Sequence, residues 1–401
     1  MERMFSRELA AVVSAYLLIV VMMAGTLPTP LYSLYAQQLG LSPLWITMVF
    51  AMYALAILAA LLLFGRLSDS LGRLPVIAIS LGLTLLCLLT FIFRPTLSGL
   101  FVARAFSGLA VGLLVGTTTA YLAELLDNRS RAALISSVSN MAGLGLGALM
   151  AGALAQYGSA PLRDGYQCLL VMLLPSLLLP WMPETVSPTA HGTWLRIQRL
   201  QVPQSIRPAF MAAALAVFCG FSFLGLFAAL AGRFLLVGLH HSGFLLSGAV
   251  VFSAFCSAAG SQCLVARRAP RRVVSYGVLA LPLALLGVWR AFALASLSLF
   301  LFSAVLGGIG AGMVLRGGLG LVTSLAPTDR LAEVCSCLFV AAYLGLILPV
   351  VGMGLLLVYV GLPLAILLFC AAVSILAGLS RNAMSNLECA PLMREARALR
   401  E

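Results

Sequence analysis

The sequence has few charged residues. Asp, Glu, Lys and Arg together make up 9% of its 401 residues, while 62% are hydrophobic, whereas an ordinary soluble domain carries about 25% charged residues. A soluble fold of this length cannot bury that much apolar surface. The composition therefore excludes a soluble enzyme, a disordered chain and a nucleic-acid-binding protein. The apolar runs are continuous and do not alternate with polar residues, which argues against a porin-like barrel.

Lysine is absent altogether, so the net charge of +12 comes from 24 Arg residues against 12 acidic ones. The nine Cys residues lie almost all within apolar runs, which is typical of buried thiols and not of disulfides or metal ligands. No polar segment contains a nucleophile–base pair, a metal-binding cluster or a phosphate-binding loop. We therefore predict that the protein is not an enzyme and that it needs no cofactor or metal.

The sequence does contain long apolar runs. A helix that spans a bilayer needs about 20 apolar residues, and clusters of charged residues, Pro and Gly divide the chain into twelve runs of that kind. The predicted spans are residues 8–35, 44–64, 74–93, 97–126, 132–156, 166–182, 209–237, 243–266, 273–289, 293–325, 332–359 and 362–379.

These runs predict an all-α membrane protein with 12 transmembrane helices in two pseudo-symmetric six-helix bundles. The bundles comprise residues 1–182 and 209–380, with a cytoplasmic central loop at 183–208 and a cytoplasmic tail at 381–401. Eighteen of the 24 Arg residues fall in segments on one side of the membrane, and only three fall in loops on the other side. Because cationic residues accumulate in cytoplasmic loops, both termini are predicted to be cytoplasmic.

The two halves of the chain resemble each other. Gly108 and Gly112 in the fourth span recur as Gly308 and Gly312 in the tenth. An internal repeat around a central loop is typical of transporters built from two bundles, which hold the substrate between them near the membrane midplane. The repeat therefore predicts a transporter.

Three short motifs carry a family resemblance. The loop after the second span reads Gly-Arg-Leu-Ser-Asp-Ser-Leu-Gly-Arg from Gly65 to Arg73, and the fourth span reads Arg-Ala-Phe-Ser-Gly-Leu-Ala-Val-Gly from Arg104 to Gly112. The sixth span ends in Pro-Glu-Thr at residues 183–185. These motifs resemble those of the major facilitator superfamily. The resemblance covers essentially the whole chain and implies the fold of that family and transport by alternating access.

The resemblance also implies that the loop after the second span is a cytoplasmic latch. Asp69 is the only acid in this loop. It is expected to cap a neighbouring helix N-terminus and to pair with an Arg across the bundle interface, which would favour the outward-facing state. The alternative is a solvated ion pair worth about 0–1 kcal/mol. The residues assigned to gating are Gly65, Asp69, Gly72, Arg73, Glu124 and Arg129.

The fifth span suggests a direction of transport. From Asn140 to Gly152 it is similar to the Gly-x-x-x-Gly-Pro-x-x-Gly-Gly element of antiporter-type exporters, although Ala148 stands where Pro is usual and Ala151 where Gly is usual. Together with a general similarity to drug-exporter branches of the family, this element favours export.

Charged residues inside the spans indicate the substrate site. An Arg at the centre of a membrane helix costs about 2.5–3.5 kcal/mol, so it faces a cavity or a partner. Arg104 and Arg316 lie in the fourth and tenth spans, which line the central cavity in this family. The alternatives are a structural Arg104 bonded to backbone carbonyls and a snorkelling Arg316. Pro28 and Pro30 break the first span, and Thr29 and Tyr32 beside that break are further candidates for substrate binding. The residues assigned to substrate binding are Arg104, Arg316, Tyr32, Thr29, Asn140 and Tyr343.

The lack of acidic residues inside the spans predicts the charge of the substrate. No Asp, Glu or His lies in the middle of any predicted span, and exporters of cationic drugs usually need a buried acid. Two cavity cations without an acid favour an anionic or zwitterionic metabolite, siderophore-like compound or drug. We predict a secondary active transporter that exports such a molecule, coupled to protons. A proton-coupled importer of an organic anion and a non-transporting membrane sensor on the same fold are the alternatives.

The expected partners are the small-molecule substrate, protons and membrane lipid, with no nucleic acid, and the chain is expected to be a monomer. Its expected location is the bacterial inner membrane, which it crosses many times.

Overall fold

The structure is a computed structural model that describes residues 5–65, 67–186, 201–241, 243–327 and 330–398. Every regular element in these residues is a helix. Twelve helical segments in this part of the chain are long and apolar enough to cross a membrane. The prediction of an all-α protein with twelve membrane spans is therefore confirmed.

Nine helical elements form the first half of the chain. They are α1 (Arg7–Thr26), α2 (Tyr32–Leu39), α3 (Pro43–Phe64), α4 (Leu67–Leu71), α5 (Arg73–Phe93), α6 (Leu97–Leu126), α7 (Arg129–Tyr157), α8 (Asp164–Met172) and η1 (Leu174–Trp181). Eight more form the second half. They are η2 (Gln204–Ile206), α9 (Arg207–Arg233), η3 (Phe234–Gly238), α10 (Phe244–Leu264), α11 (Pro270–Ala293), α12 (Leu297–Leu325), α13 (Leu331–Tyr359) and α14 (Leu362–Ala398).

Side-chain caps fix where several spans begin. The side chains of Ser6, Thr96, Asn128 and Ser296 accept hydrogen bonds from backbone N–H groups in the first turns of α1, α6, α7 and α12. Such caps satisfy N–H groups that have no partner inside the helix. The caps on α6 and α12 begin equivalent helices of the two halves.

Proline interrupts two spans. The first span breaks where predicted, because α1 ends at Thr26 and α2 begins at Tyr32, with Pro28 and Pro30 between them. Proline lacks the N–H that an α-helix needs at that position. The sixth span is not one continuous α-helix. It consists of α8 followed by the 3₁₀ segment η1, which contains Pro175 and Pro180.

The last helix is longer than predicted. Hydropathy ends the twelfth span at Leu379, but α14 continues to Ala398 through the polar segment expected as a tail. Hydropathy detects only the apolar part of a helix. The added residues include Ala, Leu, Met, Glu and Arg, which are good helix formers.

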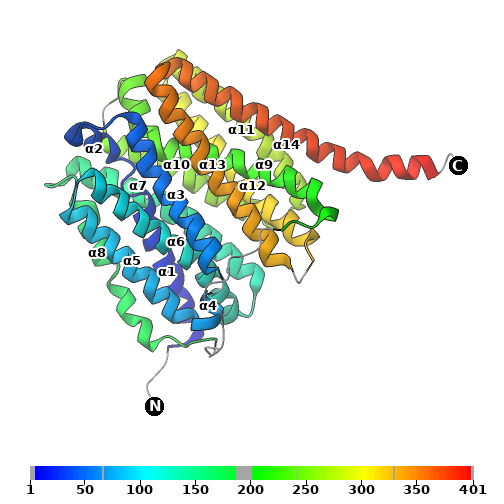
Figure 1. The fold of residues 1–401 in the computed structure, drawn as a ribbon, viewed down its shortest axis with the longest axis horizontal. Helices are drawn as coiled ribbons and strands as arrows, with labels where there is room; N and C mark the ends of the chain where they lie inside the picture. Colours follow the sequence, from blue (N-terminus) through cyan, green and yellow to red (C-terminus); the bar gives the residue numbers. More distant parts are fainter. Residues whose placement is uncertain (1–4, 66, 187–200, 242, 328–329, 399–401) are drawn as a thin grey trace.

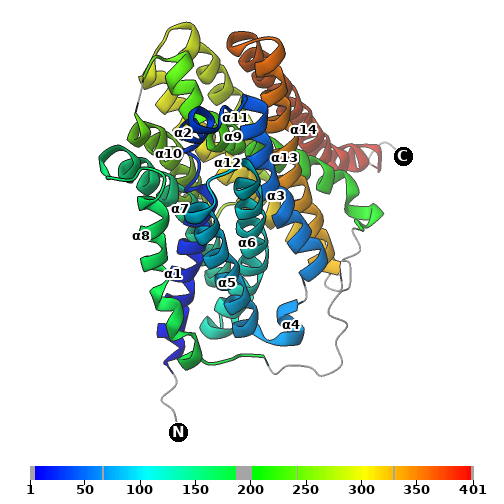
Figure 2. The same ribbon diagram turned by 60° about the vertical axis from the view of Figure 1, so that its left-hand side comes forward.

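The helices are arranged as two groups (Figures 1 and 2). Within each group the repeated glycines allow close packing: Gly108 and Gly112 of α6 lie against the backbone of α3, while Gly308 and Gly312 of α12 lie against that of α10. Large apolar side chains such as Phe302, which is 62% exposed, cover the outside. An exposed apolar surface of this extent is suited to lipid.

Most of the contact between the groups comes from two helix pairs, α7 with α10 and α3 with α13. We call the face at which α1 begins the terminal face, and the other the opposite face. Toward the opposite face, Gly152 of α7 lies against the backbone of Phe244, Gly248 of α10 against that of Ala148, and Gly354 of α13 against the side chain of Thr47. Both joins are therefore tightly packed at the opposite face.

Candidate functional site

Arg104 is the most deeply buried charge in the part of the chain that the structure describes. It lies on α6 with 0% of its surface exposed. Its Nη1 donates a 2.6 Å hydrogen bond to the carbonyl oxygen of Gly25 at the end of α1, and its guanidinium carbon lies 4.3 Å from the centre of the Tyr53 ring. The backbone bond expected under the structural alternative is therefore present, together with a cation–π contact.

Arg104 also has hydrogen-bonding capacity to spare. Its Nε and Nη2 have no partner among the described residues, and neither do Thr29 Oγ1, Tyr32 OH and Ser107 Oγ, which are buried as well. Arg104 is bonded to the last turn of α1, and Thr29 and Tyr32 lie in and directly after the break that follows that turn. Buried polar groups are normally satisfied, so several unpaired ones together indicate a place for a ligand or water. The sequence-assigned residues Arg104, Thr29 and Tyr32 thus lie in one cluster.

The other three substrate candidates do not join this cluster. Arg316 on α12 and Asn140 on α7 are half-buried and form no hydrogen bond or ion pair within the described ranges. Tyr343 on α13 stacks edge-on against Phe221 of α9, with ring centres 6.0 Å apart. Its helix α13 packs against α3 at the join between the two groups.

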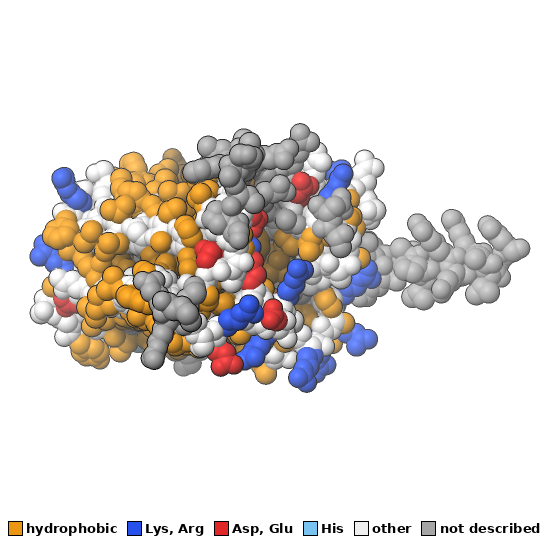
Figure 3. Space-filling view, turned by 90° about the horizontal axis from the view of Figure 1, so that it is seen from below, with side chains coloured by type: hydrophobic (Ala, Val, Ile, Leu, Met, Phe, Trp, Pro, Cys, Tyr) orange, Lys and Arg blue, Asp and Glu red, His pale blue; other side chains and the backbone are white. Residues whose placement is uncertain are grey.

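The loop after the second span forms an ion-pair cluster at the terminal face. Arg73 Nη1 lies 2.6 Å from Asp69 Oδ1 and Arg73 Nη2 lies 2.8 Å from Glu124 Oε1. Thr185 donates a further hydrogen bond of 2.5 Å to Glu124. The Arg73 side chain is only 9% exposed, whereas Asp69 is 63% exposed. Charged side chains gather across the middle of this face (Figure 3).

The capping role expected of Asp69 belongs to a different carboxylate. Both oxygens of Glu184 accept hydrogen bonds of 2.9 Å from the backbone N–H groups of Arg73 and Leu74, at the start of α5. A carboxylate is favourable there because it satisfies free N–H groups at the positive end of the helix. All partners of Asp69 and Arg73 within the described residues lie in the first group, so in this conformation neither pairs across the interface.

The remaining gating candidates have separate positions. Gly72 has a φ of +100°, and a side chain there would collide with Glu184, so the conformation requires glycine. Gly65 ends α3. Arg129 is exposed at the first residue of α7 and has no ion-pair partner in the described part of the chain. Arg66 lies outside the described residues.

Sequence reasoning missed two residues of these clusters. Tyr53 supplies the ring beneath Arg104, and its hydroxyl in a largely apolar span was the only signal. Glu184 was visible only as part of the Pro-Glu-Thr motif, and its partners on α5 lie more than 100 residues earlier in the chain.

Sequence comparisons agree with this architecture. The sequence profile of the family described as Major Facilitator Superfamily matches residues 15–272. Multidrug resistance protein MdtL of Klebsiella pneumoniae is 24% identical over 179 residues, which are 43% of this chain and 39% of that protein. Major facilitator superfamily multidrug transporter mfsB of Aspergillus fumigatus is 33% identical over 115 residues, or 28% of this chain and 19% of that protein. The matched part of the chain thus spans less than half the length of either relative.

Solved structures match nearly the whole chain. The human organic anion transporter MFSD10 (TETRAN) is 18% identical with a TM-score of 0.68, covering 94% of this chain and 99% of that chain. The peptide transporter POT is 12% identical with a TM-score of 0.76, covering 94% of each chain. At these identities the likeness extends to the fold alone.

Proposed function

This chain belongs to the major facilitator superfamily, and we propose that it exports a small organic anion or zwitterion by alternating access, in exchange for protons. It is a multi-pass membrane protein and a transporter of that family, and members of the family are not enzymes. The export of an anion is the proposal.

The cluster around Arg104 is the observation that carries the choice of an anion. Two nitrogens of a buried guanidinium that have no partner among the described residues, with the Thr29 and Tyr32 hydroxyls nearby, present donors to an acceptor. Within the described residues, every Asp or Glu of a span lies near a helix end, as Glu124 does. A lipophilic cation would have no counter-charge in such a membrane interior.

The direction of transport is proposed from the relatives. MdtL and mfsB are named for multidrug resistance and multidrug transport, which supports export. We further propose that the terminal face is cytoplasmic and that the membrane is the bacterial inner membrane. The chain acts as a monomer in which the two bundles, residues 1–182 and 209–380, rock against each other.

Transport in liposomes tests the proposal. The purified protein is reconstituted with and without a proton gradient, and uptake of salicylate, a small organic anion, is compared with uptake of tetraphenylphosphonium, a lipophilic cation. Salicylate movement that depends on the gradient supports the proposal. Movement of the cation alone overturns it.

Asp69→Asn is expected to leave the protein folded but to slow transport at least about tenfold, equivalent to 1.4 kcal/mol. Asp69 is exposed and Arg73 keeps Glu124, so the loss of folding stability is small, whereas the latch loses a charge. The measurement is turnover in liposomes beside Asp127→Asn, an exposed acid on the same face whose oxygen lies 3.5 Å from Arg7. Parental turnover of Asp69→Asn would show that the loop is no latch.

Arg316→Ala is expected to abolish transport of an anionic substrate and to leave membrane insertion intact or slightly improved, because removing an intramembrane Arg relieves about 2.5–3.5 kcal/mol. Arg316→Lys keeps the charge but not the planar fork that suits carboxylates, so partial transport is expected. Binding titrations of salicylate and tetraphenylphosphonium in detergent measure both effects, with the exposed Arg290→Ala as the control. Tight cation binding that survives in Arg316→Ala would contradict the anion proposal.

A further inference from the structure

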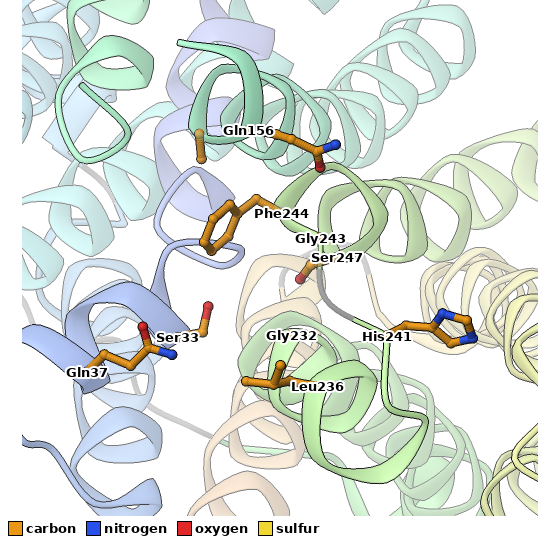
Figure 4. Close-up of a pocket in the computed structure, with 10 residues that line it drawn as sticks. Ser33, Gln37, Gln156, Gly232, Leu236, His241, Gly243, Phe244 and Ser247 are labelled. Atoms are coloured by element: carbon orange, nitrogen blue, oxygen red, sulfur yellow. The ribbon is translucent and has the colours of Figure 1, made fainter. Parts of the chain in front are cut away.

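Two adjoining cavities lie near the opposite face, between α2 and the end of α9 with η3, and the larger one also reaches the end of α7 and the start of α10. Their volumes are about 360 Å³ and about 240 Å³, and they share Ser33, Gln37, Gly232 and Leu236. The larger reaches the range of about 300–1,000 Å³ that is usual for small-molecule sites. We call the two cavities together the outer vestibule. Figure 4 shows Ser33 and Gln37 of α2 facing Gly232 and Leu236 across it.

The outer vestibule concentrates unpaired polar atoms. Of seven buried side-chain polar atoms without a hydrogen-bond partner in the described residues, four belong to residues that line it: Thr29 Oγ1, Tyr32 OH, Arg233 Nε and Ser247 Oγ. Thr29, Tyr32 and Ser247 are only 3%, 3% and 2% exposed. Buried polar groups without partners are unfavourable, so their grouping around one cavity indicates a site that a ligand completes.

The charged and polar residues that line the vestibule indicate the charge of its ligand. No Asp or Glu is among the described residues that line the vestibule, and Arg233 is its permanent cation. Gln156 already accepts a 3.0 Å hydrogen bond from the backbone N–H of Leu245 through its Oε1, so its amide N–H₂ remains as a donor. His241 also lines the larger cavity, with its ring on the side away from Ser33 and Gln37 (Figure 4). An excess of donors beside an unopposed guanidinium suits an acceptor with negative charge.

We propose that the outer vestibule is a second binding site, which takes a small organic anion with its charged end at Arg233 and its polar groups on Tyr32, Thr29 and Ser247. The choice of an anion as transported ligand rests on the proposed function. Thr29 and Tyr32 line the vestibule, and Arg104 is bonded to Gly25 at the end of α1, just before these two residues in the chain, so this segment connects the vestibule to the Arg104 cluster. An exported anion leaving Arg104 passes this segment and is held in the vestibule before release.

A cysteine-protection experiment tests the site without measuring transport. Ser33→Cys is placed in a background in which the exposed Cys263 is replaced by Ser, and its modification by a charged maleimide is followed in detergent with and without salicylate. At a salicylate concentration ten times the Kd, modification is expected to slow about tenfold. Ser98→Cys, exposed at the start of α6, is the control position and is expected to show no protection.

Further variants assign the protection to the vestibule. Arg233→Gln is expected to remove it, and Arg290→Gln, an exposed Arg that stacks on Trp289, is expected to retain it. Arg104→Gln is expected to retain it too, which separates this site from the proposed central one. Protection that is absent, that survives in Arg233→Gln, or that tetraphenylphosphonium provides equally would overturn the proposal. Protection that persists while liposome transport of salicylate fails would overturn only the proposed function.

Discussion

Replacing Arg104 by Gln is expected to reduce transport of an anionic substrate by about a hundredfold or more. A hydrogen bond to a charged group contributes about 1.5–3 kcal/mol, and two guanidinium nitrogens of Arg104, Nε and Nη2, have no partner among the described residues. Losing both would weaken binding by two or more factors of ten, at 1.4 kcal/mol for each. Liposome uptake and a salicylate titration of the purified protein measure the two consequences.

Two control variants separate substrate binding by Arg104 from its structural contacts with Gly25 and Tyr53. Arg104→Lys can keep a bond to the Gly25 carbonyl but loses the planar fork, so partial transport is expected. Tyr53→Phe keeps the ring that lies 4.3 Å from the guanidinium, and transport close to parental is expected. Unchanged salicylate affinity in Arg104→Gln would show that Arg104 holds α1 in place and does not bind the substrate.

The spans were predictable because their signal is local. A long run of apolar residues between charged ends rarely forms anything but a membrane span. Accordingly, α6 begins and ends at the residues that hydropathy predicts. The break at Pro28 and Pro30 was predictable for the same reason, since proline acts on its own backbone. The end of α14 was not, because polar residues that are good helix formers continue a helix without adding hydropathy.

The sites were only partly predictable because their partners are distant in the sequence. A charge inside a span identified Arg104 as significant, but its bonding partner Gly25 lies 79 residues away. Glu184 takes the capping position expected of Asp69 because folding brings the end of η1 beside the start of α5. The outer vestibule combines ordinary residues such as Ser33 and Gln37. No local pattern distinguishes those from surface residues.

A second large effect is expected from Gly248→Val on α10. A Cβ at this position would collide with the backbone carbonyl of Ala148 on α7, whereas Gly260 on the same helix has open space around it. Gly260→Val is therefore a matched control for helix propensity and hydropathy. The same design applies on α13, where Gly354 lies against Thr47 and Gly352 faces open space.

Overpacking of this kind costs about 1–3 kcal/mol, and here the cost applies only to conformations in which α7 and α10 meet at the opposite face. A bias of that size shifts a two-state population by about 5- to 150-fold. We expect Gly248→Val to be folded and to bind salicylate, but to transport it more slowly by a factor in that range. Gly260→Val is expected to transport at the parental rate.

Spin labels at Ser98→Cys and Leu294→Cys report the separation of the two groups at the opposite face, since both positions are exposed there. The distance between the labels is expected to lengthen in Gly248→Val and to stay parental in Gly260→Val. Packed interfaces are bistable and do not deform continuously, so a longer distance should appear as a second population. Parental transport and an unchanged distance in Gly248→Val would mean that the α7–α10 contact is no gate, and the rocking of the two bundles would then need a different closing surface.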